Sequence, residues 1–130
     1  EFSKINLLVS KFPIDLEEIE KVITNKIALA SCTVMWRKEC FEYERFIESL
    51  DYAEEWECYT RILIKGFRGV GINEFLYFNK KHANSNTGEF WQGDKNRRLS
   101  YKKAIKLVID NLQHEKLLSK RLFLVFFVYE

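Results

Sequence analysis

The sequence predicts an α+β fold: one compact domain over residues 1–130, in which a mixed or mostly antiparallel sheet of roughly four to five strands packs against about two to four helices. A length of 130 residues is typical of one domain, and no internal repeat or linker interrupts the chain. Hydrophobic residues make up 47% of the chain and proline occurs once, which is compatible with a packed core. Helical periodicity alternates with short apolar runs, so both helices and strands are expected.

Two helices are predicted from capping residues and apolar periodicity. Asp15 and Glu18 have the spacing of a capping box, and apolar residues at 19–30 recur on one helical face. Ser100 is expected to cap the other helix, in which apolar residues at 101–112 face inward.

The middle of the chain contains a further helical pattern. From Trp36 to Leu50, large side chains recur at steps of three and four residues, which predicts a helix. Asp51 and Glu54 repeat the capping-box spacing, so another helical turn is expected to begin there.

Strands are expected where short runs are rich in apolar, aromatic and β-branched residues. The last of these runs is apolar throughout, which is typical of a central strand buried on both faces. Glycines in 66–71 are expected to form the turn between two strands, and 80–88 a polar loop. The predicted strands are 5–9, 61–67, 74–79, 89–92 and 122–129.

Cysteine and histidine do not have the spacing of a metal site. Cys32, Cys40, Cys58, His82 and His114 include no pair separated by the two to four residues that structural zinc sites use. No metal or other cofactor is therefore expected. The odd number of cysteines favours free, mostly buried thiols in a reducing compartment, and leaves open whether one of them is reactive.

No motif in the chain indicates an enzyme. The segment GFRGVG at 66–71 lacks the Gly-Lys-Ser/Thr ending of a phosphate-binding loop. Acidic residues are abundant, but their spacing does not pair two of them for acid–base catalysis. We therefore expect a non-catalytic binding domain. No signal peptide and no apolar run of about 20 residues is recognised, so a cytoplasmic location without membrane contact is expected.

Charge is strongly separated along the chain, although the overall net charge is only +2. Residues 39–57 carry eight acids against Arg45 alone, a net charge of −7. Residues 61–106 carry eleven bases against three acids, a net charge of +8. We call these the acidic segment and the basic segment. Either could bind a partner of opposite charge, or the two could face each other within the fold.

The acidic segment predicts a protein-binding surface, because tyrosine and tryptophan serve as rigid anchors and clustered carboxylates attract a basic partner. Small cytosolic immunity proteins of bacterial toxin systems resemble this chain in size, α+β composition and lack of catalytic motifs. This resemblance implies an antitoxin-like inhibitor that neutralises a basic toxin or nuclease domain. The expected partner-binding residues are Glu44, Glu48, Asp51, Tyr52, Glu54, Glu55, Trp56 and Glu57.

The basic segment supports an alternative, a nucleic-acid-binding domain that uses residues 90–106. Aromatic residues alternate there with lysine and arginine, so bases could stack while cations contact phosphates. The identity of the partner and the oligomeric state stay open. The residues of this alternative site are Trp91, Lys95, Arg97, Arg98, Tyr101, Lys102 and Lys103.

Overall fold

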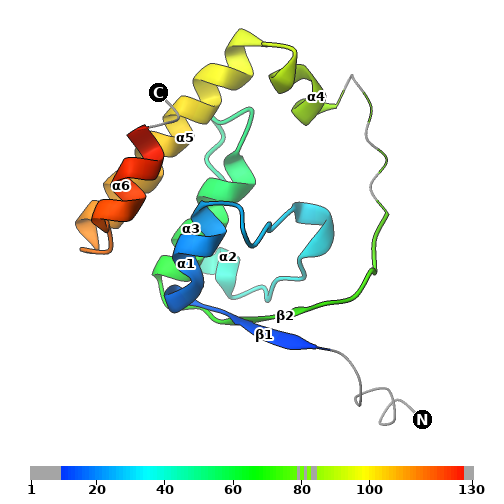
Figure 1. Cartoon of the computed structure of the whole chain (residues 1–130), viewed down its shortest axis with the longest axis vertical. Coiled ribbons are helices and arrows are strands. Elements are labelled where there is room, and N and C mark those ends of the chain that lie inside the picture. Colours follow the sequence, from blue (N-terminus) through cyan, green and yellow to red (C-terminus); the bar gives the residue numbers. More distant parts are fainter. Residues whose placement is uncertain (1–9, 79, 81, 83–84, 128–130) are drawn as a thin grey trace.

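The computed structural model describes residues 10–78, 80, 82 and 85–127. In this part of the chain there are six α-helices, two short 3₁₀ helices and two strands (Figure 1). The expected sheet of four to five strands is therefore wrong: the fold is still mixed, but helices dominate it. The expected strand at 5–9 lies outside the described residues.

The two strands form a short antiparallel ribbon at one side of the molecule (Figure 1). β1 (Lys11–Ile14) pairs with β2 (Gly69–Ile72), so that Lys11 lies opposite Ile72. Gly71 has a specific role there, because a Cβ at this position would lie 2.1 Å from Cζ of Phe12. Glycine thus lets the aromatic ring lie across the neighbouring strand.

Two helices form the centre of the fold, α3 (Glu54–Ile64) and α5 (Lys95–His114), which pack against each other. α1 (Ile19–Ile23) packs on α3, and α6 (Lys120–Phe127) returns beside α5 (Figure 1). Apolar side chains from all four helices form the main core. Its buried members are Ile19, Val22, Ile23, Leu63, Ile105, Val108, Leu112, Leu122 and Phe126.

A second, smaller core lies on the other side of α3, where aromatic rings cover two buried thiols. Cys40 of α2 (Cys40–Tyr43) packs against Cys58, Tyr59 and Ile62 of α3. The Trp36 ring lies 4.6 Å from the Tyr59 ring, measured between centroids. Burial raises the pKa of Cys58 to about 11.

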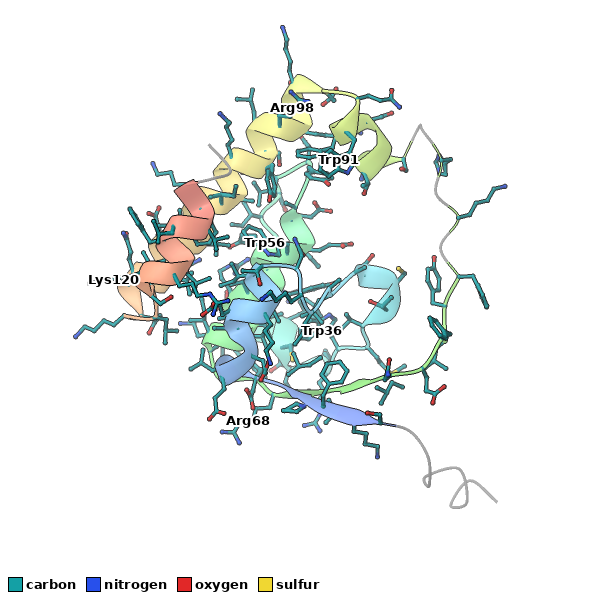
Figure 2. The ribbon with its side chains drawn as sticks, viewed as in Figure 1. Trp36, Trp56, Arg68, Trp91, Arg98 and Lys120 are labelled. Atoms are coloured by element: carbon teal, nitrogen blue, oxygen red, sulfur yellow. The ribbon has the colours of Figure 1, made fainter. Side chains whose placement is uncertain are left out.

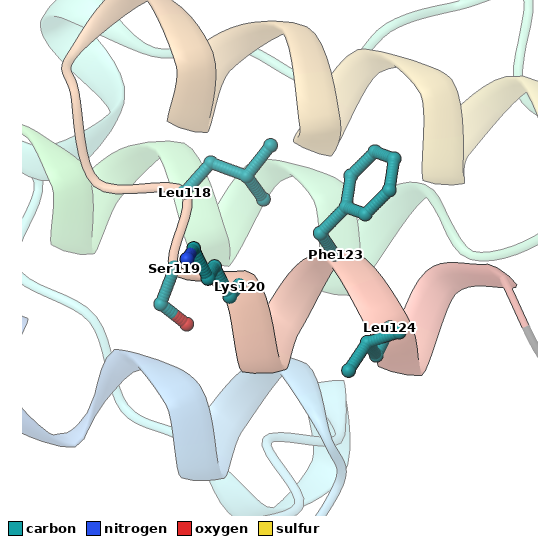
Figure 3. A pocket seen from close by; sticks show the side chains of 5 residues that line it. All are labelled: Leu118, Ser119, Lys120, Phe123 and Leu124. Carbon is teal, nitrogen blue, oxygen red and sulfur yellow. The ribbon is translucent and has the colours of Figure 1, made fainter.

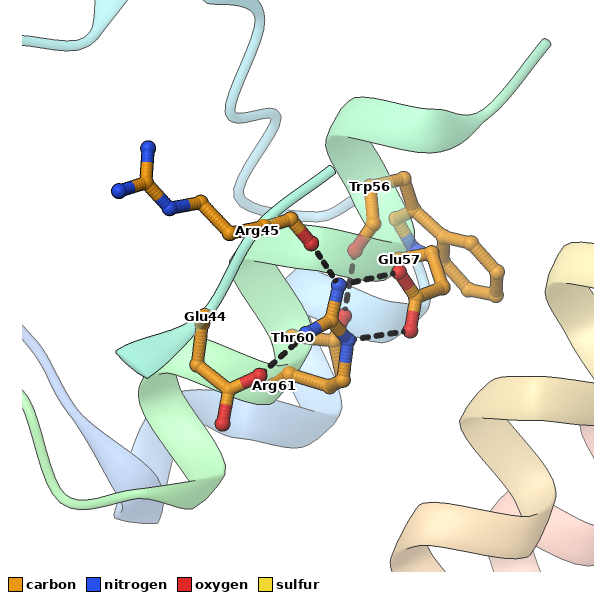
Figure 4. Close-up of polar contacts among 6 residues, drawn as sticks. All are labelled: Glu44, Arg45, Trp56, Glu57, Thr60 and Arg61. Atoms are coloured by element: carbon orange, nitrogen blue, oxygen red, sulfur yellow. Dashed lines mark hydrogen bonds and ion pairs between the residues drawn. The ribbon is translucent and has the colours of Figure 1, made fainter. Parts of the chain in front are cut away.

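A buried ion cluster joins α3 to the segment that follows α2 (Figure 4). Glu57 is 0% exposed, and its carboxylate accepts hydrogen bonds from Nε and Nη2 of Arg61 at 2.6 and 2.9 Å. The same guanidinium donates to Glu44 through Nη1 and to the carbonyl oxygen of Arg45 through Nη2. Burial alone would lower the pKa of Arg61, but these two carboxylates hold it above its ordinary value. The guanidinium therefore neutralises two carboxylates and satisfies one main-chain acceptor.

Two expected strands are helical over most of their described residues. In the expected strand at 61–67, α3 continues to Ile64, which places Ile62 in line with buried Cys58. In the expected strand at 122–129, α6 turns Leu122 and Phe126 into the core, and 128–129 lie outside the described residues. A run of about eight apolar residues is compatible with a strand or with a helix. In this protein these residues pack against neighbouring helices and are themselves helical.

The expected helix over 36–50 is reduced to the single turn of α2. Glu44 has extended backbone angles, φ −118° and ψ 119°, which end the helix. Its carboxylate then reaches Arg61, as does the carbonyl oxygen of Arg45. The end of α2 thus places the Glu44 carboxylate and the Arg45 carbonyl where both contact Arg61.

Glycine and loop predictions are corrected in the segment between α3 and α5. Residues 69–71 of the expected turn at 66–71 belong to β2. The expected strand at 74–79 is not formed over 74–78, which are irregular and exposed, and 79 lies outside the described residues. Residues 89–91 of the expected strand at 89–92 belong to α4 (Asn86–Trp91), which begins inside the expected loop and is capped by Ser85. The cap is a hydrogen bond of 3.1 Å from the Gly88 amide to Ser85 Oγ.

Of the three capping predictions, only the one for Asp15 is confirmed. α3 begins at Glu54 as expected, but Ala53 with φ 63° precedes it and Asp51 does not cap it. Asp15 accepts a hydrogen bond from the Glu17 amide at 3.0 Å, as a cap residue should, although α1 ends at Ile23 rather than continuing to 30. α5 has the expected inward face, but it begins at Lys95 because Asp94 caps it instead of Ser100. The Arg97 amide donates to Asp94 Oδ1 at 2.8 Å, which lowers the pKa of Asp94.

Substitution of Arg61 tests the ion cluster. Arg61→Ala leaves the buried carboxylates of Glu57 and Glu44 without their partner, so we expect a loss of about 3–5 kcal/mol in the free energy of unfolding. Denaturant unfolding followed by tryptophan fluorescence measures this loss. Arg121→Ala, which removes only an exposed pair with Glu20, is the control and is expected to lose less than about 1 kcal/mol. Equal losses in the two variants would contradict the role of the cluster.

Thiol reactivity tests the second core. The three cysteines are free; Cys32 is exposed, whereas Cys40 and Cys58 are buried. With a pKa raised to about 11, Cys58 stays protonated at pH 8 and forms the reactive thiolate only toward strongly alkaline pH. We expect a thiol reagent at pH 8 to modify Cys32 rapidly in the native protein, and all three cysteines after denaturation. Rapid native modification of Cys58, located by peptide mass spectrometry, would show that the core is open.

Candidate functional site

The acidic segment does not form a free ring of carboxylates. Two of its expected partner-binding acids, Glu44 and Glu57, are buried and bound to Arg61. Glu55 accepts a hydrogen bond of 3.3 Å from the Ser31 amide. The remaining three expected acids are accessible to solvent to different extents: Glu48 and Asp51 are exposed, and Glu54 is half-buried at the start of α3.

The two expected aromatic anchors of the acidic segment face the protein interior. The Tyr52 ring stacks on Phe90 of α4 with a centroid distance of 4.5 Å and an interplanar angle of 9°. Trp56 is half-buried against the main core, with its ring 6.2 Å from that of Tyr101. Burial raises the pKa of Tyr52, and a hydrogen bond with Thr87 opposes this shift. Tyr52 and Trp56 therefore hold α4 and α5 in place.

The backbone around Tyr52 is attached to α5 through one buried hydroxyl. The Tyr52 amide donates to Ser100 Oγ at 2.9 Å, and that hydroxyl donates to the Tyr52 carbonyl oxygen at 2.8 Å. One helical turn further along, Lys103 Nζ lies 2.5 Å from Ser49 Oγ. The acidic and basic segments thus lie against each other, with the exposed acids in a loop that α5 supports.

The last part of the basic segment, residues 86–106, forms the corner between α4 and α5. Arg97 links the two helices, because its guanidinium bonds to Glu89 Oε2 at 2.6 Å and to Asn86 Oδ1 at 3.0 Å, both on α4. It also lies 3.4 Å from Asp94 Oδ1. Tyr101 is half-buried, and its ring packs on Phe90. Arg97 and Tyr101 were expected to contact a ligand, but the structure engages both in supporting the corner.

Other cations of the basic segment are exposed to solvent. Lys95, Arg98, Lys102 and Lys106 are exposed, and none of them forms an ion pair with a carboxylate of the described residues. We call these four residues the cationic face of α5. Trp91, the last residue of α4, lies at the same corner and is 76% exposed (Figure 2).

The spacing of the cationic face follows from the helix. Lys95, Lys102 and Lys106 are separated by seven and four residues, so they share one side of α5, and Arg98 lies beside them. At 1.5 Å per residue, Lys95 and Lys106 are about 16 Å apart along the axis. Lys106 falls in the sequence range expected for the nucleic-acid site, but only the helical spacing identifies it as a member.

Shallow depressions lie on the described part of the chain, and one beside the ion cluster is lined by Tyr43, Glu44, Lys65 and Phe67. A shallow depression beside α6 is lined by Leu118, Ser119, Lys120, Phe123 and Leu124, which include no acid–base pair (Figure 3). In the described part of the chain, no three His, Cys, Asp or Glu side chains are close enough to hold a metal ion. Of the helices described, none is sufficiently long and apolar to cross a membrane.

The chain matches no known family model, no curated protein and no solved structure. A functional assignment therefore depends on the geometry of its surfaces.

Replacement of Ser100 tests the attachment of the acidic loop to α5. Ser100→Ala leaves the amide and the carbonyl of Tyr52 without this partner, so we expect the free energy of unfolding to fall by about 1–3 kcal/mol. Denaturant unfolding measures it. Ser31→Ala, at an exposed position, is the control, and its change should stay within about 0.5 kcal/mol. If Ser100→Ala matched the control, the hydroxyl would not be holding the loop.

Proposed function

We propose that this protein is a non-catalytic nucleic-acid-binding domain and that its binding surface is the cationic face of α5 together with Trp91. One contrast carries the proposal. The cations of this face are exposed and unpaired with described carboxylates, whereas two carboxylates and both aromatic anchors of the acidic segment are engaged within the fold.

The arrangement of the cations suits a phosphate backbone. A row of charges about 16 Å long on one side of a helix can contact several consecutive phosphates and release their counterions. α5 is packed against α3, and its N-terminal end is linked to α4 by Arg97. The row therefore needs little rearrangement when a ligand binds, which reduces the entropic cost of binding.

The charge of the surrounding residues limits the surface to the N-terminal half of α5. Asp110 is exposed on the same helix, one turn beyond Lys106. A carboxylate at that position repels phosphate, so the contacts are expected to end near Lys106. At the other end, Asp94 is turned into the cap of α5 and accepts from the Arg97 amide. The cap leaves the corner between α4 and α5 with Lys95 and Arg98 as its outward charges.

An inhibitor or immunity-type protein that neutralises a basic partner is the second candidate. It is favoured by the loop at 48–54, where Glu48 and Asp51 are exposed and the backbone is held by Ser100. A loop fixed in this way presents its carboxylates without a large ordering cost. Its contact surface would be smaller than the eight residues expected from sequence, because Glu44, Glu57, Tyr52 and Trp56 have structural roles.

Charge reversal on α5 tests the proposed function. Lys95→Glu, Lys102→Glu and Lys106→Glu together should lower affinity for fluorescein-labelled DNA and RNA oligonucleotides by at least about tenfold at low salt. They should also reduce the slope of log K against log salt by roughly 2–3, because up to three phosphate contacts are lost. Fluorescence anisotropy over a salt series gives both quantities.

A matched control separates the α5 surface from overall charge. Lys26→Glu, Arg37→Glu and Lys38→Glu change the formal charge by the same amount at exposed positions elsewhere. The proposal requires this control to bind nearly as the wild type does. It is overturned if the wild type binds no nucleic acid at low salt, or if both triple variants lose affinity equally. The second candidate would then be supported by a basic protein that binds the wild type but does not bind the double variant Glu48→Lys, Asp51→Lys.

A further inference from the structure

Trp91 leaves a large aromatic side chain in solvent at the end of α4, close in the sequence to exposed cations of α5. The residue before it, Phe90, is half-buried, so the end of α4 turns one ring inward and one outward. Exposed single hydrophobic residues are common on protein surfaces and need no explanation alone. Two features bear on the role of Trp91: the packed rings that support it, and the cations at the same corner.

Trp91 is mounted on a chain of packed aromatic rings. Its ring meets Phe90 edge to face, with centroids 5.4 Å apart and planes at 83°. Phe90 in turn stacks on Tyr52 at 4.5 Å and meets Tyr101 edge to face at 5.4 Å. α4 is also fixed to α5 by the contact between Arg97 and Glu89. The outward ring thus belongs to a supported corner rather than to a free loop.

Cations lie at the same corner as the Trp91 ring. Arg98 lies against the turn that connects α4 to α5: a Cβ built on Gly93 would be 3.4 Å from Arg98 Nη2. Gly93 has φ +95° and follows Trp91 by two residues. Lys95 begins α5 immediately after the cap residue. The junction of α4 and α5 therefore carries both Trp91 and Arg98 (Figure 2), and Lys95 is the first residue of α5.

We propose that this corner recognises an unpaired nucleobase, so that the ligand of the domain is single-stranded nucleic acid. The base stacks on Trp91, Arg98 and Lys95 contact the phosphates on either side of it, and Lys102 and Lys106 contact the strand further along α5. In a duplex the faces of the bases are covered by their neighbours, so a stacking residue has nothing to bind there. This inference rests on the proposed function and names its ligand class.

Substitution of Trp91 tests the stacking contact. Base–aromatic stacking contributes about 1–3 kcal/mol per base, so Trp91→Ala should weaken binding of a labelled 12-nucleotide oligothymidylate by roughly 5- to 150-fold. Binding of a labelled blunt-ended duplex without a loop should stay nearly unchanged. Trp91→Phe keeps an aromatic face and should recover part of the lost affinity. Phe75→Ala, which removes another exposed aromatic ring, is the matched control and should leave both affinities unchanged.

The outcomes separate this inference from the proposed function. If the oligothymidylate binds and the α5 charge reversal abolishes binding, but Trp91→Ala weakens neither ligand or weakens both equally, the stacking inference is overturned and the proposed function stands. If neither oligonucleotide binds to the wild type, the proposed function fails, and the inference fails with it. Selective loss of single-strand affinity, with partial recovery in Trp91→Phe, supports both. Circular dichroism of each variant confirms that the helices are retained.

Discussion

The segment between α2 and α3 is held by one partly buried guanidinium, that of Arg61. A fully buried carboxylate such as that of Glu57 is stable only beside an opposite charge, and Arg61 supplies that charge from the next turn of α3. The same group also binds Glu44 and the Arg45 carbonyl, so it attaches the segment after α2 to α3. The stability of the second core and the direction of the chain that leads to Tyr52 both follow from this cluster.

A series of contacts extends from this cluster to the proposed binding surface. The chain after Arg45 reaches Ser100, whose hydroxyl holds both main-chain groups of Tyr52. The Tyr52 ring then positions Phe90, and Phe90 supports Trp91. The acidic segment is therefore the structural support of the basic segment, with its aromatic side chains inside the interface between them. This division explains how strong local charges of both signs coexist in a chain of small net charge.

Local signals in the sequence were sufficient for some elements and insufficient for others. The cap at Asp15 and the inward face of α5 could be predicted, since both depend on residues within a few positions of each other. The strands expected at 61–67 and 122–129 could not be distinguished from helices, because short apolar runs fit both periods. The outward-facing lysines of α5, in contrast, could be predicted from helical spacing. The structural role of Tyr52 could not, because Ser100 is 48 residues away in the sequence.

The exposed segment that follows β2 affects how copies of the protein behave toward one another. Phe75 is 97% exposed and Phe78 91%, and Leu76 and Tyr77 between them are also exposed. An apolar run next to an edge strand is a template for pairing between chains. Like charge on the cationic face of α5 opposes such pairing at low ionic strength. If a polyanion binds this face as proposed, it neutralises that charge and removes the repulsion between copies of the protein.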